Sequence, residues 1–133
     1  MKRLFAALAV LILCACDTVT DHYGTLEEAR EDRLFERGWL PNILPVTSVD
    51  IVTSNELDLN YSIGSFAFAV EDGPKFFAQL EKGPPSTTKF KDWREIVDKY
   101  PLDTYSHWSY TNDHGTWAFF CIESEGSCEY YGW

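Results

Sequence analysis

Residues 103–133 read DTYSHWSYTNDHGTWAFFCIESEGSCEYYGW and carry the clearest secondary-structure pattern in the chain. Three runs in this stretch are rich in aromatic and β-branched residues: Asp103 to Thr111, Thr116 to Glu123 and Cys128 to Trp133. Asn112-Asp113-His114-Gly115 and Ser124-Glu125-Gly126-Ser127 separate them, and both segments are typical of turns. The pattern predicts an antiparallel three-stranded meander at the end of the chain.

Local start and stop signals upstream of the meander predict three helices. Thr25 and Glu28 form a capping box ahead of an amphipathic stretch, and Gly38 offers a left-handed stop. Pro101 ends the last of the helical patterns. The expected helices cover residues 26–37, the segment between Asp72 and Gly83, and residues 91–100.

Alternating residues between the first two helices predict additional strands. Residues 49–53 and 65–70 alternate apolar and polar side chains, as half-buried strands do. Residues 54–64 alternate as well, so they could extend either strand or form one of their own. We therefore expect residues 25–133 to form a single α+β domain, whose antiparallel sheet ends in the meander, with about three helices packed on one side.

The N-terminus has the features of an export signal. Lys2 and Arg3 precede an apolar run from Leu4 to Leu13, which is too short for the about 20 residues of a membrane-spanning helix. Leu13-Cys14-Ala15-Cys16 resembles a bacterial lipobox. The residue before the cleaved bond must be small, so Ala15 makes Cys16 the expected site of lipidation. The alternative is a buried N-terminal helix, although no cap or polar face accompanies the run.

This interpretation divides the chain into a signal peptide at residues 1–15, a short tether at residues 16–24 and the folded domain. Cleavage removes two of the 11 basic residues and none of the 21 acidic ones, so the formal net charge changes from −10 to −12. Such a surface repels nucleic acid and anionic headgroups. We expect attachment to a membrane of the bacterial cell envelope through acyl chains, with the domain facing the periplasm or the cell exterior.

Several short segments resemble a known bacterial family. They are Leu34-Phe35-Glu36-Arg37-Gly38-Trp39-Leu40-Pro41, Leu44-Pro45, Asp50-Ile51, Asn55-Glu56-Leu57-Asp58-Leu59-Asn60 and Gly64-Ser65-Phe66. Together they cover roughly residues 25 to 70, and they resemble the YbbD head domain, a family of short proteins that are often lipoproteins. The resemblance implies an envelope lipoprotein and supplies no catalytic residues.

Cys121 and Cys128 are expected to form a disulfide. If the second turn is centred near Ser124 and Glu125, the two cysteines lie opposite each other on neighbouring strands. An exported chain also enters an oxidising compartment.

The rival interpretation is a zinc site, because His107, His114, Cys121 and Cys128 recur every seven residues. The expected hairpins keep these four side chains from converging, so we expect no metal and no other cofactor.

The two histidines of the meander also raise the possibility of an enzyme. His107 and His114 lie near Asp103 and Asp113 in the sequence, and a histidine oriented by a carboxylate can act as a general base. Histidines on an aromatic strand or in a turn more often have no catalytic role. No nucleophile elbow and no phosphate-binding glycine loop accompanies them. We therefore expect no catalytic residues.

Aromatic residues are concentrated in the meander and suggest a contact surface. The first meander strand places Tyr105 on one face and Trp108 on the other, while helices on one side cover a single face. Exposed rings among carboxylates are typical of binding surfaces. The expected partner surface consists of Trp108, Tyr110, Glu123, Glu125 and Glu129. Alternatively, the end of the chain wraps so that both faces are covered.

These observations favour a membrane-tethered envelope lipoprotein that acts as a non-catalytic binding or accessory module for a protein or glycan partner. One alternative is an inhibitor or immunity-type protein against a cationic envelope enzyme, because a strongly acidic surface accelerates such encounters. A second is a small envelope hydrolase that uses a His/Asp pair. A third is an accessory subunit that docks through the loop from Trp39 to Pro45.

Overall fold

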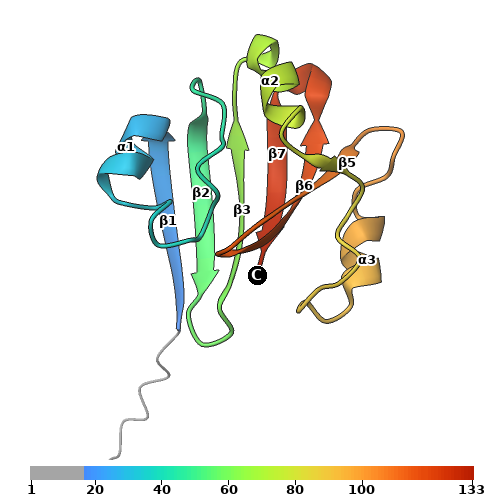
Figure 1. Cartoon of the computed structure of the whole chain (residues 1–133), viewed down its shortest axis with the longest axis horizontal. Coiled ribbons are helices and arrows are strands. Elements are labelled where there is room, and N and C mark those ends of the chain that lie inside the picture. Colours follow the sequence, from blue (N-terminus) through green and yellow to red (C-terminus); the bar gives the residue numbers. More distant parts are fainter. Residues whose placement is uncertain (1–16) are drawn as a thin grey trace, which may run out of the picture.

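The computed structural model describes residues 17–133, which form one seven-stranded antiparallel sheet with helices against it (Figure 1). The strands are β1 (Thr18–Thr25), β2 (Val49–Glu56), β3 (Tyr61–Ala67), β4 (Glu81–Lys82), β5 (Ser106–Asn112), β6 (Gly115–Ile122) and β7 (Ser127–Gly132). The helices are α1 (Leu26–Glu31), α2 (Gly73–Phe77) and α3 (Trp93–Asp98), with short 3₁₀ turns η1 (Val70–Asp72) and η2 (Glu123–Glu125). The strand order is β1-β2-β3-β7-β6-β5-β4. The α+β fold class is confirmed.

Strands β5, β6 and β7 form the meander predicted from residues 103–133. The side-chain oxygen of Asn112 closes the first turn, accepting hydrogen bonds from the backbone N–H groups of His114 and Gly115 at 2.8 and 3.2 Å. Gly126 closes the second turn at φ +63°, a conformation that glycine adopts without steric cost. The register places Cys121 directly opposite Cys128.

The expected tether at residues 16–24 is wrong for Thr18 to Gly24, because these residues lie in the edge strand β1. This strand pairs with β2 along its length, from Thr18 opposite Glu56 to Thr25 opposite Val49. Tyr23 anchors it by turning its ring into the core, where it is buried. Only Asp17 then separates Cys16 from the sheet.

Helix α1 begins as predicted and ends earlier. The Glu28 N–H donates to the Thr25 hydroxyl at 3.2 Å, as a capping residue requires. The helix stops at Glu31 instead of continuing to Arg37 because Arg33 adopts a left-handed conformation at φ +58°. The chain reversal lets the Leu34 N–H reach the Ala29 carbonyl at 3.0 Å, and it buries the Leu34 side chain completely.

The structure decides between the arrangements that the alternating pattern of residues 54–64 left open. Residues 54–64 are divided: β2 runs to Glu56, a turn covers residues 57–60, and β3 begins at Tyr61. Helices α2 and α3 are shorter than expected, and β4 was not predicted because it is only two residues long. Among the described residues, no helix has both the length and the apolar character needed to cross a membrane.

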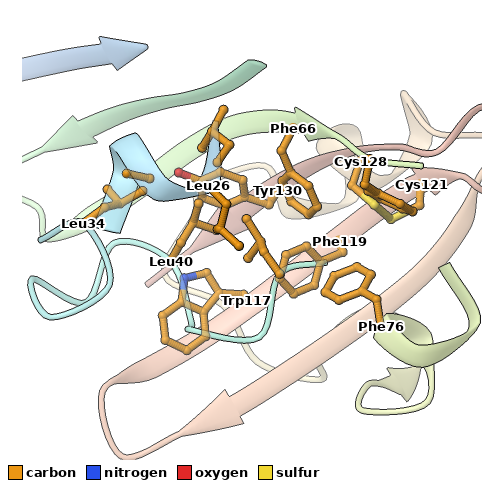
Figure 2. Packing of buried hydrophobic residues seen from close by; sticks show 14 of the residues in the cluster. Leu26, Leu34, Leu40, Phe66, Phe76, Trp117, Phe119, Cys121, Cys128 and Tyr130 are labelled. Carbon is orange, nitrogen blue, oxygen red and sulfur yellow. A yellow bond between two sulfur atoms is a disulfide. The ribbon is translucent and has the colours of Figure 1, made fainter. Parts of the chain in front are cut away.

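The core is divided between the two faces of the sheet. On the first face, α1, α2 and the loop after α1 cover a cluster that includes Leu26, Leu34, Leu40, Phe66, Phe76, Trp117, Phe119 and Tyr130 (Figure 2). On the second face, Tyr100, Phe120 and Tyr131 pack with Phe90 and Trp93 from the α3 segment. The expectation that all helices lie on one side is therefore wrong for α3. The cause is β6, whose consecutive rings Phe119 and Phe120 point to opposite faces and both require cover.

Candidate functional site

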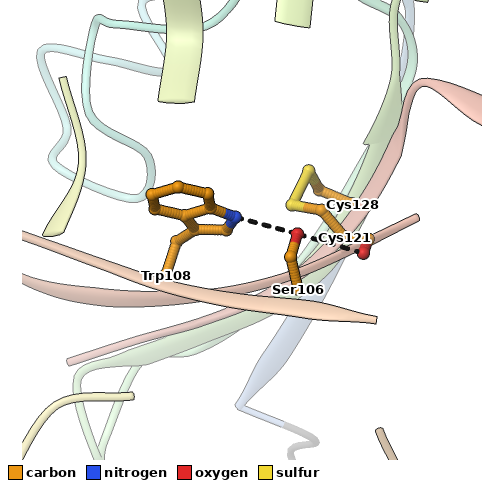
Figure 3. The surroundings of a disulfide bond; sticks show 4 residues. All are labelled: Ser106, Trp108, Cys121 and Cys128. Carbon is orange, nitrogen blue, oxygen red and sulfur yellow. Dashed lines mark hydrogen bonds between the residues drawn. A yellow bond between two sulfur atoms is a disulfide. The ribbon is translucent and has the colours of Figure 1, made fainter. Parts of the chain in front are cut away.

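The Cys121–Cys128 disulfide is present and joins β6 to β7 at one end of the meander. Next to it, the Trp108 indole N–H donates to the Ser106 hydroxyl at 2.8 Å, and that hydroxyl donates to the Cys121 carbonyl at 3.4 Å (Figure 3). The bond leaves neither sulfur as a thiolate for the zinc set considered from the sequence. The disulfide also holds β6 and β7 together beside the Trp108 side chain.

Trp108 forms one wall of an open groove of about 560 Å³, which we call the Trp108 groove. It is lined by Val70, Gly73, Pro74, Phe77, Lys82, Trp108, Glu123 and Ser124. The rings of Phe77 and Trp108 stack with centroids 5.2 Å apart and an interplanar angle of 21°. Val70 is 47% exposed, which is unusual for a β-branched apolar side chain beside two aromatic rings. The groove is therefore an ordered apolar surface that stays accessible to solvent.

Three separate segments build this groove. The pairing of Lys82 in β4 with Trp108 in β5 places the end of α2 beside the strand. Phe77, the last residue of α2, then packs on the indole. The two 3₁₀ turns η1 and η2 are in contact, and they bring Val70 next to Glu123. A sequence pattern in any one segment could not reveal this arrangement.

Four carboxylates lie on the two turns η1 and η2, and one of them, Glu123, lines the groove. Glu71 and Asp72 come from η1, and Glu123 and Glu125 come from η2. Asp72 accepts a hydrogen bond from the Thr47 hydroxyl at 2.6 Å, while Glu71, Glu123 and Glu125 are exposed. These four residues are called the acidic rim below. Among the lining residues Lys82 and Glu123 carry opposite charges, so the excess of negative charge beside the groove comes from the other three carboxylates of η1 and η2.

The structure brings together part of the predicted partner surface. Trp108 and Glu123 line the groove, and Glu125 lies in the same 3₁₀ turn. Tyr110 lies farther along β5 and packs on Trp117, with ring centroids 6.2 Å apart. Glu129 projects from the second face, because its neighbours in β7 point into the first-face core. The predicted grouping is thus wrong for Tyr110 and Glu129.

The histidines of the meander do not form the proposed catalytic pair. The Nε2 atom of His107 lies 2.6 Å from the Tyr100 carbonyl oxygen, and its ring meets Phe120 edge-on. Within residues 17–133, neither His107 nor His114 forms an ion pair with a carboxylate. The His–Asp pair that does occur joins His22 to Asp50 at 3.7 Å, with both side chains mostly exposed.

The loop from Trp39 to Pro45 packs into the core, contrary to the docking role considered for it. Leu40 and Leu44 are buried, and the Trp117 indole N–H donates to the Trp39 carbonyl at 3.1 Å. Behind the loop, Tyr23 donates a hydrogen bond to Asp32, which Arg37 also contacts at 2.9 Å. Burial and the Asp32 hydrogen bond raise the pKa of Tyr23 to about 12. This hydrogen-bonded cluster joins β1 to the loop.

A second hollow of about 400 Å³ lies beside this loop. Its lining includes Arg30, Arg33, Asn112, His114 and Trp117. Glu36 forms an ion pair with Arg33 at 2.9 Å, so part of the positive charge that lines the hollow is already neutralised. The loop between α1 and β2, which lines this hollow, carries the first part of the family signature quoted from the sequence.

Residues 17–67 match the family model of the YbbD head domain. The resemblance is confirmed, and the match extends beyond the segment recognised from the sequence to include the whole of β1. It ends at the last residue of β3, so the Trp108 groove lies outside the matched residues. No curated protein and no solved structure is significantly similar to the chain. The YbbD head match supports an envelope-associated protein.

Proposed function

We propose that this chain is a bacterial envelope lipoprotein, anchored through Cys16, whose folded domain binds a cationic segment of a partner protein in the Trp108 groove. The sequence ahead of the fold supports the anchor, because Leu13-Cys14-Ala15-Cys16 has the form of a lipobox. The YbbD head match supports the envelope setting. The observation that carries the binding role is the open Trp108 groove, where the half-buried Trp108 ring stacks on the buried Phe77 ring beside the acidic rim.

The position of the groove suits an anchored protein. Strand β1 begins at the lower end of the sheet, where Thr18 pairs with Glu56, whereas α2 and η2 lie at the upper end (Figure 1). A lipid on Cys16 therefore holds the lower end at the membrane. The groove then faces away from the bilayer, toward partners in the surrounding compartment.

Charge and aromatic chemistry together favour a cationic partner. The formal net charge of −12 expected after cleavage attracts basic proteins over long distances, and the acidic rim concentrates negative charge beside the groove. An arginine or lysine entering the groove can also interact with the face of an aromatic ring, while its aliphatic stem covers Val70. This combination favours a partner segment of alternating basic and apolar residues, rather than a neutral glycan.

The binding proposal is tested with a synthetic peptide of alternating arginine and leucine, titrated into the protein at low ionic strength. We expect saturable binding that weakens with added salt, and a loss of at least about threefold in affinity in E123Q/E125Q. E27Q/E31Q is the matched control, because it removes two exposed carboxylates of α1 and leaves the rim intact. Equal loss in both variants would show that net charge alone attracts the peptide. Binding of a peptidoglycan fragment in its place would favour a glycan partner.

The anchor is tested by growing bacteria that express the full chain with radiolabelled palmitate. We expect label in the wild-type protein and in Cys14→Ser, because Cys16 follows the small residue Ala15 whereas Cys14 follows Leu13. The Cys16→Ser variant should carry none. Label that survives Cys16→Ser would contradict the proposed anchor.

A further inference from the structure

The turn between β2 and β3 exposes two leucines at the end of the sheet where β1 begins. Leu57 is 52% exposed and Leu59 is 60% exposed, and both belong to the four-residue turn Leu57-Asp58-Leu59-Asn60. Asn60 adopts a left-handed conformation at φ +51°, which closes the turn tightly before β3. Two large apolar side chains on one short turn form an apolar projection that the domain itself does not cover.

This turn is hydrogen-bonded to the residue that follows Cys16. The Leu57 N–H donates to the Asp17 carbonyl at 3.1 Å, and Thr18 pairs with Glu56. Figure 1 shows the turn at the lower end of the sheet, beside the start of β1. Asp17 follows Cys16 directly in the chain, so the residue proposed to carry the lipid is the neighbour of one that is bonded to the turn.

We propose that Leu57 and Leu59 insert into the interfacial region of the membrane to which Cys16 anchors the chain. The inference rests on the proposed lipid anchor and adds a second, non-covalent contact. Acyl chains on Cys16 bring the turn to the surface and hold it there, so insertion becomes an intramolecular step with a high effective concentration. Two contacts fix the direction of the sheet, whereas one flexible attachment does not.

The charges around the turn determine which lipid surface it fits. Asp17, Glu56 and Asp58 lie at this end of the sheet, and a hydrogen bond with Asp17 raises the pKa of Asp58 above its ordinary value. Three carboxylates are repelled by anionic headgroups. The leucines therefore suit a zwitterionic surface, where apolar burial is not opposed by headgroup charge.

Amide hydrogen exchange on the acylated full-chain product, purified from membranes and reconstituted on phosphatidylcholine vesicles, tests this inference. Relative to the unacylated Cys16→Ser protein in solution, we expect the amides of residues 57–60 to exchange at least about fivefold more slowly on vesicles. L57S/L59S should lose this protection. V46S/L102S is the matched control, because Val46 and Leu102 are 74% and 77% exposed and lie near the opposite end of the sheet.

Three results would overturn the inference. They are unchanged exchange in the turn of acylated protein, protection that persists in L57S/L59S, and stronger protection when phosphatidylglycerol replaces part of the phosphatidylcholine. Mass spectrometry of the purified protein separates this outcome from failure of the anchor. Acylated protein with an unprotected turn overturns the second contact alone, whereas an unmodified Cys16 overturns both the contact and the proposed anchor.

Discussion

Replacing Phe119 with alanine is expected to lower the free energy of unfolding by about 3 to 5 kcal/mol. Phe119 is completely buried at the centre of the first-face core (Figure 2). Its ring meets Phe76 and Phe66 edge-on, with centroids 5.5 and 6.1 Å apart. Removal of the ring leaves a cavity between α2 and the sheet that the disulfide-linked strands cannot easily close. Equilibrium denaturation in urea with the disulfide intact measures the change.

Leu102→Ala is the control for this substitution, because the Leu102 side chain is 77% exposed. It should change the free energy of unfolding by less than about 0.5 kcal/mol. A loss below about 1 kcal/mol for Phe119→Ala would contradict the packing described for the first face.

Gly64→Ala is expected to destabilise the protein by about 2 to 3 kcal/mol through a different mechanism. A Cβ atom at Gly64 would lie 1.8 Å from the Val52 carbonyl oxygen and 2.9 Å from the Tyr130 ring. The first of these contacts is with backbone, so β2 and β3 must separate to admit the methyl group. The effect would appear as a lower midpoint of thermal unfolding.

Gly24→Ala provides the matched comparison within the same sheet. Its new Cβ would meet a carboxylate oxygen of Glu28 at 3.2 Å, and that flexible side chain can move aside. Its cost should stay below about 1 kcal/mol. Similar costs at the two positions would show that β2 and β3 do not approach as closely at Gly64 as the register requires.

The parts of the fold that follow local rules could be predicted from the sequence. The meander has aromatic alternation and two strong turns, and the Thr25 cap has its required partner in Glu28. Strand β1 was missed because Thr18 to Gly24 is mostly polar and becomes a strand only through its pairing with β2. The early end of α1 was missed because Arg33, and not a glycine, takes the left-handed position.

The candidate site was only partly predictable for the same physical reason. Trp108 and Glu123 could be identified because both lie in or beside the meander. Phe77 and Val70 could not be placed next to them, because that contact depends on how α2 and η1 pack on the sheet. The error at Glu129 was avoidable, since alternation with the inward-facing Tyr130 already assigns it to the other face.

The measurement that most directly tests the binding role is the indole N–H resonance of Trp108, followed by NMR during titration with the arginine–leucine peptide. We expect a saturable shift of the Trp108 resonance, reduced by salt and by E123Q/E125Q, with little change at Trp39 and Trp117 near the other end of β6. A shift at Trp39 or Trp117 with none at Trp108 would contradict it.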